Sequence, residues 1–323
     1  MKKTAIAICL LAATASVSAQ QDAFPDKPIR LIAPYAPGGS ADVLARTLAN
    51  SLAAEIKQPV IVENKPGANT IIAASAVARA PADGYTLLLA SNASMVLNPL
   101  LYKKLTYNPD TELKLINILA EAPLVLVTNS QTGIKDIEGL KAYEKAHRGQ
   151  LNYSSIGLGN PLQLTTELIK SRLGVGATHI PFNGSAPALT ALMSNDTQMM
   201  VDVIGTSLPQ IKAGKLVPIA TTGRERLAFL PQTPTIAESG FPDFRASTWF
   251  GIAVPMATPA PVAQRLQQAI DTVMQDPAFI TTLNNQYLVA QPPQTQAQLD
   301  AFLKSDGKMW RQVIADNHIA LDN

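Results

Sequence analysis

The sequence predicts an α/β protein with two similar units, each built on a mostly parallel β-sheet flanked by helices. Short β-branched or apolar runs alternate with helix-like stretches after residue 25, a pattern typical of parallel sheets with helical crossovers. A glycine loop stands between a strand and a helix twice, at residues 34–40 and 155–161. With 323 residues, the chain is long enough for about two domains.

The first unit begins with a strand at residues 29–33, which the loop PYAPGGS at residues 34–40 ends. A helix follows from Asp42, because one face repeats apolar residues at a spacing of four, namely Leu44, Leu48, Leu52 and Ile56. The same pattern predicts strands at residues 60–62 and 86–90, with a helix at residues 71–80 between them.

The second unit repeats this order from residue 124. Strands are expected at residues 124–127 and 151–154, and the loop SIGLGNP then leads into a helix that contains Leu164, Leu168 and Ile169. The remaining elements follow in order: strands at 179–182, 199–202 and 249–254, and helices at 186–193, 261–275, 276–285 and 296–317.

The N-terminal segment is predicted to be an export signal. Residues 2–3 (KK) give it a positive start, residues 6–13 an apolar run, and residues 17–19 (VSA) a small-residue cleavage site. The apolar run is shorter than the roughly 20 residues of a membrane-spanning helix. Cys9 lies inside this run rather than at its end, which disfavours a lipoprotein acceptor. We expect cleavage after Ala19.

The composition excludes several classes of function. The formal net charge is only +2, and the 26 basic residues include both lysines of the leader, so the rest of the chain has 24 basic and 24 acidic residues. A neutral chain without a polybasic segment is not expected to bind nucleic acid. Loss of the leader also removes the one cysteine, which leaves no disulfide and no thiolate nucleophile or metal ligand.

The two glycine loops are the best candidates for a binding site. A helix N-terminus carries unpaired backbone N–H groups and about half a positive charge, so a glycine loop before it suits an anion. Gly38-Gly39 and Gly157-x-Gly159 both stand in this position, at the carboxyl ends of strands where α/β proteins bind ligands. Two such units are expected to hold one anion between them, although glycines of this kind also serve as simple tight turns.

Nucleotide-binding and catalytic motifs are missing from the sequence. Leu162 stands where a dinucleotide fingerprint needs its third glycine, and neither G-x-x-x-x-G-K-[ST] nor G-x-S-x-G occurs. His147, His179 and His318 are too scattered for a metal motif. We expect no cofactor and no metal, and a structural role for His179, with a general-base role as the alternative.

Two pairs of residues have open interpretations. Trp249 and Phe250 either stack on a ligand near the strand that contains them or fill core space. Arg224 and Arg226 are expected to anchor a loop at the surface, with contact to a ligand as the alternative.

Several ordered segments resemble the extracytoplasmic receptors of tripartite tricarboxylate transporters, the Bug or TctC family. The resemblance runs from about Phe24 to the C-terminus. It rests on residues 32–42 (IAPYAPGGSAD), 62–68 (VENKPGA), 81–87 (PADGYTL), 181–188 (PFNGSAPA), 212–216 (KAGKL), 231–238 (PQTPTIAE), 247–251 (STWFG) and 253–255 (AVP). So many segments in one order make a chance match implausible.

The resemblance implies a periplasmic, two-lobed binding protein that closes on a small organic acid and is not an enzyme. Lobe I would comprise residues 24–122 and 247–323, and lobe II residues 123–246, with crossings near Ala122 and Ser247. Ligands of the family are mostly carboxylates, held by two loops and bridging waters more than by a salt bridge. The expected partners are membrane transporter subunits or a sensor protein, and the expected state is a monomer.

The resemblance also implies which residues contact the ligand. One wall would consist of Tyr35, Ala36, Gly38, Gly39, Ser40, Ser91 and Asn92. The other wall would consist of Ser154, Ser155, Gly157, Gly159, Asn160, Phe182 and Asp202. Neither glycine loop contains lysine or arginine, which favours binding through backbone N–H groups and hydroxyls.

Two departures from the family pattern bear on the ligand. Gln163 occupies a position that is commonly histidine, and the family's P-Y-K-G is PFNG at residues 181–184. Each change removes charge or polarity, so we expect a flatter, more apolar pocket that suits an aromatic or longer-chain mono- or dicarboxylate. Two alternatives stay open: a secreted hydrolase that uses Asp202 with His179, and a ligand sensor of a signalling system.

Overall fold

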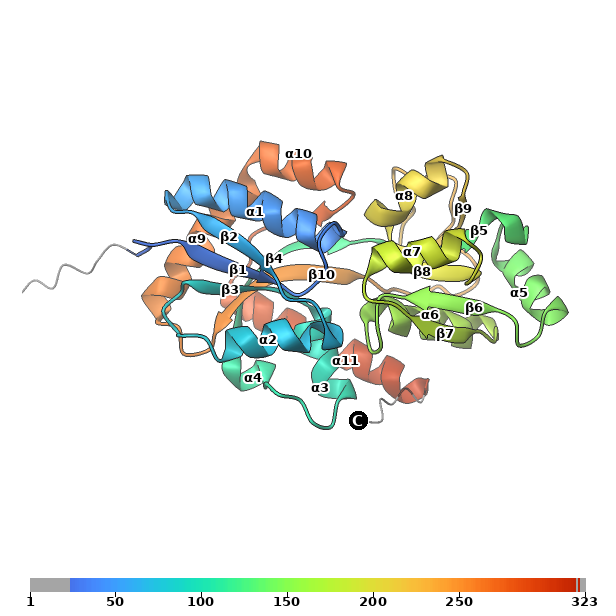
Figure 1. Cartoon of the computed structure of the whole chain (residues 1–323), viewed down its shortest axis with the longest axis horizontal. Helices are drawn as coiled ribbons and strands as arrows, with labels where there is room; N and C mark the ends of the chain where they lie inside the picture. Colours follow the sequence, from blue (N-terminus) through green and yellow to red (C-terminus); the bar gives the residue numbers. More distant parts are fainter. Residues whose placement is uncertain (1–23, 318, 320–323) are drawn as a thin grey trace, which may run out of the picture.

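The chain folds around two separate β-sheets, each with helices on both faces (Figure 1). The structure, a computed structural model, describes residues 24–317 and residue 319. The expected export signal, Cys9 and the cleavage site therefore lie outside the described residues, as does His318. The two-lobed α/β fold predicted from the sequence is confirmed.

The six-stranded sheet has the order β11-β4-β10-β3-β1-β2. Its strands β3 and β10 are buried along their whole length, as expected for strands covered on both faces. Their bounds are Ile29–Ala33 (β1), Val60–Asn64 (β2), Thr86–Ser91 (β3), Leu113–Ala122 (β4), Thr248–Pro255 (β10) and Val289–Ala290 (β11).

The five-stranded sheet has the order β7-β6-β8-β5-β9. Its central strands β8 and β5 are also fully buried. The bounds are Leu124–Asn129 (β5), Asn152–Ser155 (β6), Thr178–Pro181 (β7), Met199–Val203 (β8) and Leu216–Thr221 (β9).

The helices occupy both faces of each sheet. In Figure 1, α1 and α9 lie on one face of the six-stranded sheet and α2 and α11 on the other, while α7 and α8 lie opposite α5 and α6 on the second sheet. The helices are α1 (Ser40–Ile56), α2 (Ile71–Ala78), α3 (Asn98–Leu101), α4 (Pro109–Glu112), α5 (Ile137–Ala146), α6 (Pro161–Leu173), α7 (Ser185–Met193), α8 (Ile204–Lys212), α9 (Ala260–Gln275), α10 (Pro277–Asn285) and α11 (Gln296–Asp316).

The chain passes from one sheet to the other twice. It leaves the first sheet after β4, which ends at Ala122, and returns where β10 begins at Thr248. We call the part built on the six-stranded sheet lobe I and the part built on the five-stranded sheet lobe II. The exact limits of the lobes, residues 24–122 with 247–323 and residues 123–246, stay a prediction.

The sheets are mixed rather than mostly parallel. β1 pairs in parallel with β2 and β3, but β10 runs antiparallel to both of its neighbours, and so does β5. Each antiparallel strand lies directly beside a crossing between the lobes. A strand that arrives from the other lobe enters without a helical crossover, so the right-handed parallel connection is not imposed on it.

Strands β4, β9 and β11 and helices α3, α4, α5 and α8 were not predicted. Pro218 lies within β9 and Pro209 within α8, and proline disfavours both elements. The structure accommodates Pro218 because β9 is at the edge of its sheet. Tertiary position therefore outweighs local propensity at Pro218.

Candidate functional site

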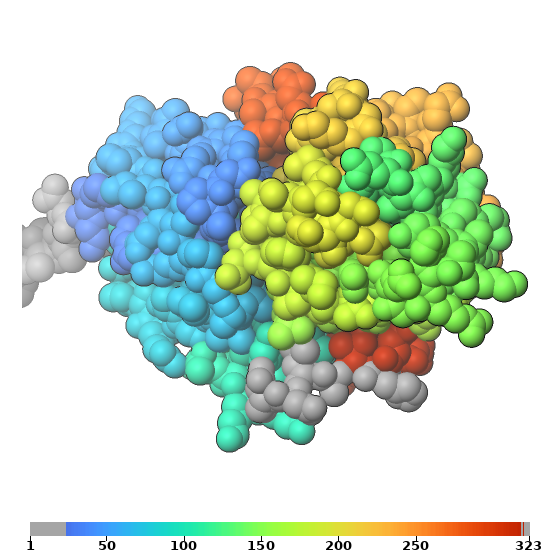
Figure 2. All heavy atoms as spheres, turned by 45° about the vertical axis from the view of Figure 1, so that its right-hand side comes forward, coloured from blue at the N-terminus to red at the C-terminus, as the bar shows by residue number. Residues whose placement is uncertain are grey.

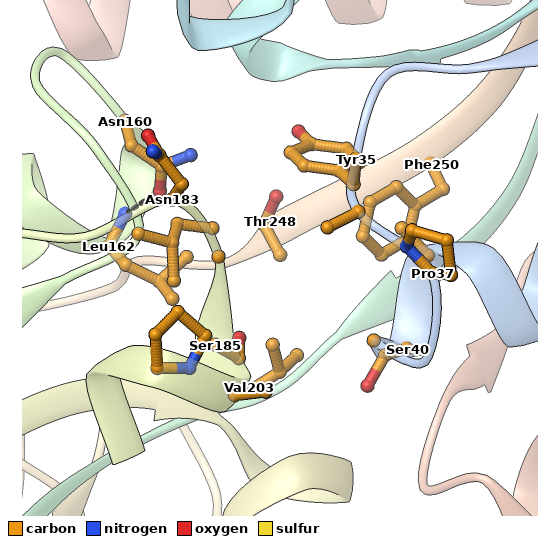
Figure 3. Close-up of a pocket in the computed structure, with 17 residues that line it drawn as sticks. Tyr35, Pro37, Ser40, Asn160, Leu162, Asn183, Ser185, Val203, Thr248 and Phe250 are labelled. Atoms are coloured by element: carbon orange, nitrogen blue, oxygen red, sulfur yellow. Dashed lines mark hydrogen bonds between the residues drawn. The ribbon is translucent and has the colours of Figure 1, made fainter. Parts of the chain in front are cut away.

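A cavity lies between the lobes, at the N-terminal ends of four helices (Figure 3). Residues from the starts of α1, α6 and α7 line it, and so does Val203, which immediately precedes α8. Thr248 and Phe250 of β10 complete it. The lining residues are Tyr35, Ala36, Pro37, Gly39, Ser40, Ala41, Ile156, Asn160, Leu162, Asn183, Gly184, Ser185, Ala186, Pro187, Val203, Thr248 and Phe250.

The lobe I wall is the loop between β1 and α1. Gly39 is the N-cap of α1, and no side chain among the described residues caps this helix, so the first N–H groups of α1 keep their capacity to bind an anion. Gly38 has a φ of 88°, and its N–H donates to Asp42 at 3.0 Å. Gly38 is therefore held by the helix behind it and is not among the lining residues.

Asp42 is in turn held by the residues around it. Its carboxylate accepts from the Arg46 and Asn64 side chains, and Asn64 also donates to the carbonyl of Tyr35. Burial acts to raise the pKa of Asp42, but the bonds from Arg46, Gly38 and Asn64 outweigh burial and lower it. The loop is thus fixed from behind, and its residues Tyr35, Ala36 and Ser40 face the cavity.

Tyr35 lies across the cavity from lobe II, as Figure 3 shows. Its hydroxyl is 2.9 Å from the hydroxyl of the fully buried Ser91, and its ring packs edge-on against Phe250. Burial raises the pKa of Tyr35 to about 12, although the bond with Ser91 acts in the opposite direction. The phenol is therefore neutral at pH 7, and Ser91 orients Tyr35 instead of lining the cavity.

Asn92 has a similar supporting position. Its side-chain amide donates to the carbonyl of Ser247 at 3.2 Å, and its oxygen accepts from the Thr248 hydroxyl at 2.9 Å. Asn92 is fully buried, so it positions Thr248 at the base of the cavity.

The β6–α6 loop of lobe II bonds largely to itself. Asn160 caps α6 by accepting from the N–H of Leu162 at 2.9 Å, and Gly159 donates to the Gln163 side chain at 2.6 Å. The Ser155 hydroxyl bonds to both the N–H and the carbonyl of Gly157. Of this loop and the start of α6, only Ile156, Asn160 and Leu162 line the cavity, within the part of the chain that the structure describes.

His179 supports the same loop from the neighbouring strand. Its Nε2 lies 2.6 Å from the Ser155 hydroxyl, and its ring stacks on Tyr153 with centroids 4.7 Å apart. Burial lowers the pKa of His179 to about 4, with Lys170 adding to the decrease and Glu167 opposing it. A neutral, packed His179 fits the structural role expected from the sequence.

Asp202 is buried behind the cavity rather than in it. Its carboxylate accepts hydroxyl bonds from Ser185 at 3.2 Å and Ser207 at 2.7 Å, and a further bond from Thr206 at 2.5 Å. Burial raises the pKa of Asp202 although these donors act to lower it. Ser185 begins α7, and Thr206 and Ser207 belong to the first turn of α8. Asp202 therefore ties the starts of two cavity-lining helices to β8.

Five of the fourteen predicted contact residues line the cavity: Tyr35, Ala36, Gly39, Ser40 and Asn160. The other nine lie outside the lining: Gly38, Ser91, Asn92, Ser154, Ser155, Gly157, Gly159, Phe182 and Asp202. Several of them hold lining residues in place, as described above. The Ser154 hydroxyl is buried without a hydrogen-bond partner among the described residues, and Phe182 packs with the lobe II core.

In the loop between β7 and α7, Phe182 was predicted to contact the ligand, whereas the residues after it were not. Asn183, Gly184, Ser185, Ala186 and Pro187 all line the cavity. Gly184 is the N-cap of α7, with a φ of 114° and no capping side chain among the described residues. A signal was present: Gly-Ser-Ala occurs at residues 39–41 and again at residues 184–186, each time at the start of a helix.

The structure distinguishes the two members of the aromatic pair and shows what holds one of the two arginines. Phe250 lines the cavity, whereas Trp249 is 1% exposed and donates to Asp306 in the core. Arg226 pairs with Glu238 and bonds to the carbonyl of Pro231, as expected for a loop anchor. Arg224 is exposed.

Charge at the cavity comes from the backbone. Among the described residues that line it, none is lysine, arginine, histidine, aspartate or glutamate. Four convergent helix N-termini supply positive potential without a charged side chain. Within residues 24–317 and 319, no cluster of histidine, aspartate and glutamate has a metal-binding arrangement, and no helix is both long and apolar enough to cross a membrane.

A cavity of this kind between two lobes is the arrangement of a two-lobed solute-binding protein. The family model described as "Tripartite tricarboxylate transporter family receptor" matches residues 44–319. Protein BugT of Bordetella pertussis is 33% identical over 322 residues, which cover 98% of each chain. The chain therefore belongs to this receptor family, as the resemblance implied.

Solved structures agree with this assignment. R. palustris Rpa4515 with adipate is 28% identical with a TM-score of 0.88, over 92% of this chain and 99% of that one. The periplasmic binding protein BugD is 29% identical with a TM-score of 0.86, over 92% and 99%. MatC from Rhodopseudomonas palustris with bound malate is 29% identical with a TM-score of 0.84, over 90% and 100%.

Proposed function

We propose that this protein binds an organic acid with an unsubstituted, longer carbon chain or an aromatic ring, and that one carboxylate lies at the helix N-termini that line the cavity. The observation that carries the proposal is the combination of four helix N-termini with an apolar remainder of the cavity. Tyr35, Pro37 and Phe250 form one side and Ile156 and Leu162 another. Such surfaces offer nothing to the hydroxyls of a hydroxylated acid, which lose hydrogen bonds to water on entry.

The relatives support a carboxylate as the ligand, without favouring an unhydroxylated one. Adipate, bound to R. palustris Rpa4515, is an unhydroxylated acid, and malate, bound to MatC, is a hydroxylated one. The amide groups of Asn160 and Asn183 and the hydroxyl of Ser40 are lining groups that can donate to a ligand. The hydroxyls of Ser185 and Thr248 instead donate to Asp202 and Asn92. We infer that the carboxylate binds to the two amides, to the Ser40 hydroxyl and to the N–H groups of α1 and α7.

The biological role that we propose is delivery to the membrane subunits of a tripartite transporter after export to the periplasm by residues 1–19. Ligand contacts on both lobes favour the closed state, which the membrane subunits then recognise. A sensor protein that recognises the same closed state is the second candidate, and an added ligand that changes gene expression but not uptake would favour it.

The hydrolase alternative has little support from the residues that it requires. Asp202 is on β8 and His179 on β7, and strand β6 lies between them. Two strand spacings amount to about 10 Å, too far for a hydrogen bond between the two side chains. The carboxylate of Asp202 bonds to three hydroxyls instead. We propose binding without turnover.

A ligand screen tests the function. Mature protein is incubated with adipate, glutarate, benzoate, terephthalate, malate and citrate, and thermal unfolding is recorded with product analysis by chromatography. Adipate or an aromatic acid should stabilise the protein most, since a ligand at about 1,000 times its Kd contributes about 4 kcal/mol. Tight citrate binding without binding of any unhydroxylated acid would overturn the ligand class. Formation of a product would overturn the binding role.

A further inference from the structure

The lobes also meet at a place that the ligand cavity does not include. The turn after α10 in lobe I packs against α8 and the segment after β9 in lobe II. In Figure 1 the α10 and α8 regions adjoin at the upper edge of the molecule, and Figure 2 shows the same two regions in contact at the surface. Gln286 and Tyr287 form this contact from lobe I, and neither lines the cavity.

Tyr287 is partly buried and packs against the hydrophobic core of lobe II. Its ring packs edge-on against Phe229 with centroids 4.9 Å apart, and the Lys212 amine lies 5.9 Å from the ring centre. In the described part of the chain, the hydrophobic cluster around Val125, Leu192 and Leu208 includes only Tyr287 from outside residues 123–246.

The turn is tied to lobe I, so the contact couples the two lobes. The Gln286 side chain donates to the Thr47 hydroxyl of α1 at 3.0 Å, and the next strand, β11, pairs with β4. Tyr287 has a φ of 59°, a left-handed conformation that L-residues other than asparagine and aspartate rarely adopt. With this backbone conformation, the Tyr287 side chain leaves the turn and reaches Phe229 of lobe II.

Gly205 allows the close approach from the lobe II side. A Cβ at Gly205 would lie 2.7 Å from the carbonyl oxygen of Gln286 and 3.3 Å from the Ser40 hydroxyl. The first of these distances is shorter than van der Waals contact, and its partner is backbone that is already fixed to α1 and β11. A side chain at residue 205 would therefore hold the lobes apart.

We infer that the contact of Tyr287 with Phe229, which the close approach at Gly205 permits, determines ligand affinity although Tyr287 does not touch the ligand. On this inference the contact between Tyr287 and lobe II breaks when the lobes open, so it adds its free energy to the closed state alone. Apparent affinity rises with the fraction of molecules that are already binding-competent. This inference rests on the proposed function only in assuming that the closed lobes bind the ligand.

The lobe distance can be measured without any ligand. The sequence after Ala19 contains no cysteine, so Asn50→Cys on α1 and Thr190→Cys on α7, both exposed, give two spin-label positions. Tyr287→Asn removes the ring but keeps a residue that tolerates positive φ. Tyr287→Phe is the matched control, because the described residues offer its hydroxyl no hydrogen bond.

We expect electron–electron distance distributions of the ligand-free Tyr287→Asn protein to shift toward longer distances, while Tyr287→Phe resembles wild type. Gly205→Ala, which acts from the other lobe, should cause the same shift. Adipate affinity, measured by calorimetry, should fall about 3- to 10-fold for Tyr287→Asn, the factor that one aromatic pair contributes.

Unchanged distance distributions in both Tyr287→Asn and Gly205→Ala would overturn the inference, and so would a shift of equal size in Tyr287→Phe. If the distances shift but wild type binds none of the screened acids, the proposed ligand class fails and the lobe contact stands. Melting curves of each variant show whether it is folded. Because Tyr287→Asn and Gly205→Ala change opposite lobes, the test can still be made if one of them does not fold.

Discussion

The two glycine loops that the sequence singles out contribute to the cavity in different ways. The β1–α1 loop presents Tyr35, Ala36, Gly39 and Ser40 to the cavity, and its N-cap has no capping side chain among the described residues. The β6–α6 loop has equally many glycines, but its Gly159 N–H is bonded to Gln163. Glycine before a helix therefore indicates a possible anion site, and free N–H groups decide whether it is one.

The β7–α7 loop presents to the cavity the uncapped helix start that was expected of the β6–α6 loop. It shares Gly-Ser-Ala with the β1–α1 loop, and both N-cap glycines lack a capping side chain within the described residues. The shared feature is chemical: a residue without a side chain at the N-cap leaves the helix donors available. Each lobe thus contributes one uncapped helix start of the same sequence type.

The largest effect should come from a charge placed at Asn160, the polar residue with which the β6–α6 loop lines the cavity. Asn160→Asp keeps an oxygen that caps α6 but adds a negative charge beside the ligand carboxylate. Two unit charges about 5 Å apart at an effective dielectric of about 20 repel by about 3 kcal/mol, so calorimetry should show a loss of affinity of about 100-fold.

Gln163→Glu is the matched control for that prediction. It adds the same charge one turn further along α6, and its side chain still accepts from Gly159. We expect a clearly smaller loss of affinity. Equal losses in the two variants would contradict the placement of Asn160 in the cavity and of Gln163 behind it.

The next largest effect should distinguish the two lobe II loops. Asn183→Ala, in the loop before α7, removes an amide donor to a charged ligand group, worth about 1.5–3 kcal/mol, and should weaken binding about 10-fold or more. Ser155→Ala in the β6–α6 loop should change affinity less than about 2-fold, although it lowers the melting temperature. If Ser155→Ala were the weaker binder of the two, the β6–α6 loop would be the main anion site.

A smaller effect is expected in lobe I. Tyr35→Phe keeps the ring that lines the cavity but leaves the fully buried Ser91 hydroxyl without its partner. An unpaired buried hydroxyl costs about 1–3 kcal/mol of folding free energy, which urea unfolding would measure. The affinity should change less than about 3-fold, and a larger loss would mean that the phenol itself binds the ligand.

The smallest effect concerns pH. The folded protein keeps His179 neutral down to a pKa of about 4, whereas an unfolded histidine binds a proton below about pH 6.5. The unfolded state therefore binds more protons between these values, and stability should fall as the pH is lowered from 6.5 to 4. In His179→Gln this part of the pH dependence should disappear from melting curves, and an unchanged slope would exclude His179 as its source.

Most helices and strands were predictable from the sequence, because their signals are local. The stripe from Leu44 to Ile56 predicts α1, and the apolar runs of β1, β3 and β5 stand between clear breaks. β9 escaped prediction because Pro218 is tolerated only at a sheet edge, and edge position is not a local property.

The sequence by itself determined the α/β pattern, the family and the neutral charge balance after residue 19, and it predicted helix N-termini as the anion site. Only the tertiary structure decided which of these helix starts face the cavity. A backbone N–H is available to a ligand only if no other group accepts from it, and the competing acceptor comes from the packing of each loop. In the β6–α6 loop, the Gln163 side chain accepts from the N–H of Gly159, and the Ser155 hydroxyl, which His179 contacts, accepts from the N–H of Gly157. At the start of α7, Asp202 accepts from the Ser185 hydroxyl instead. The first N–H groups of α7 therefore have no capping side chain among the described residues.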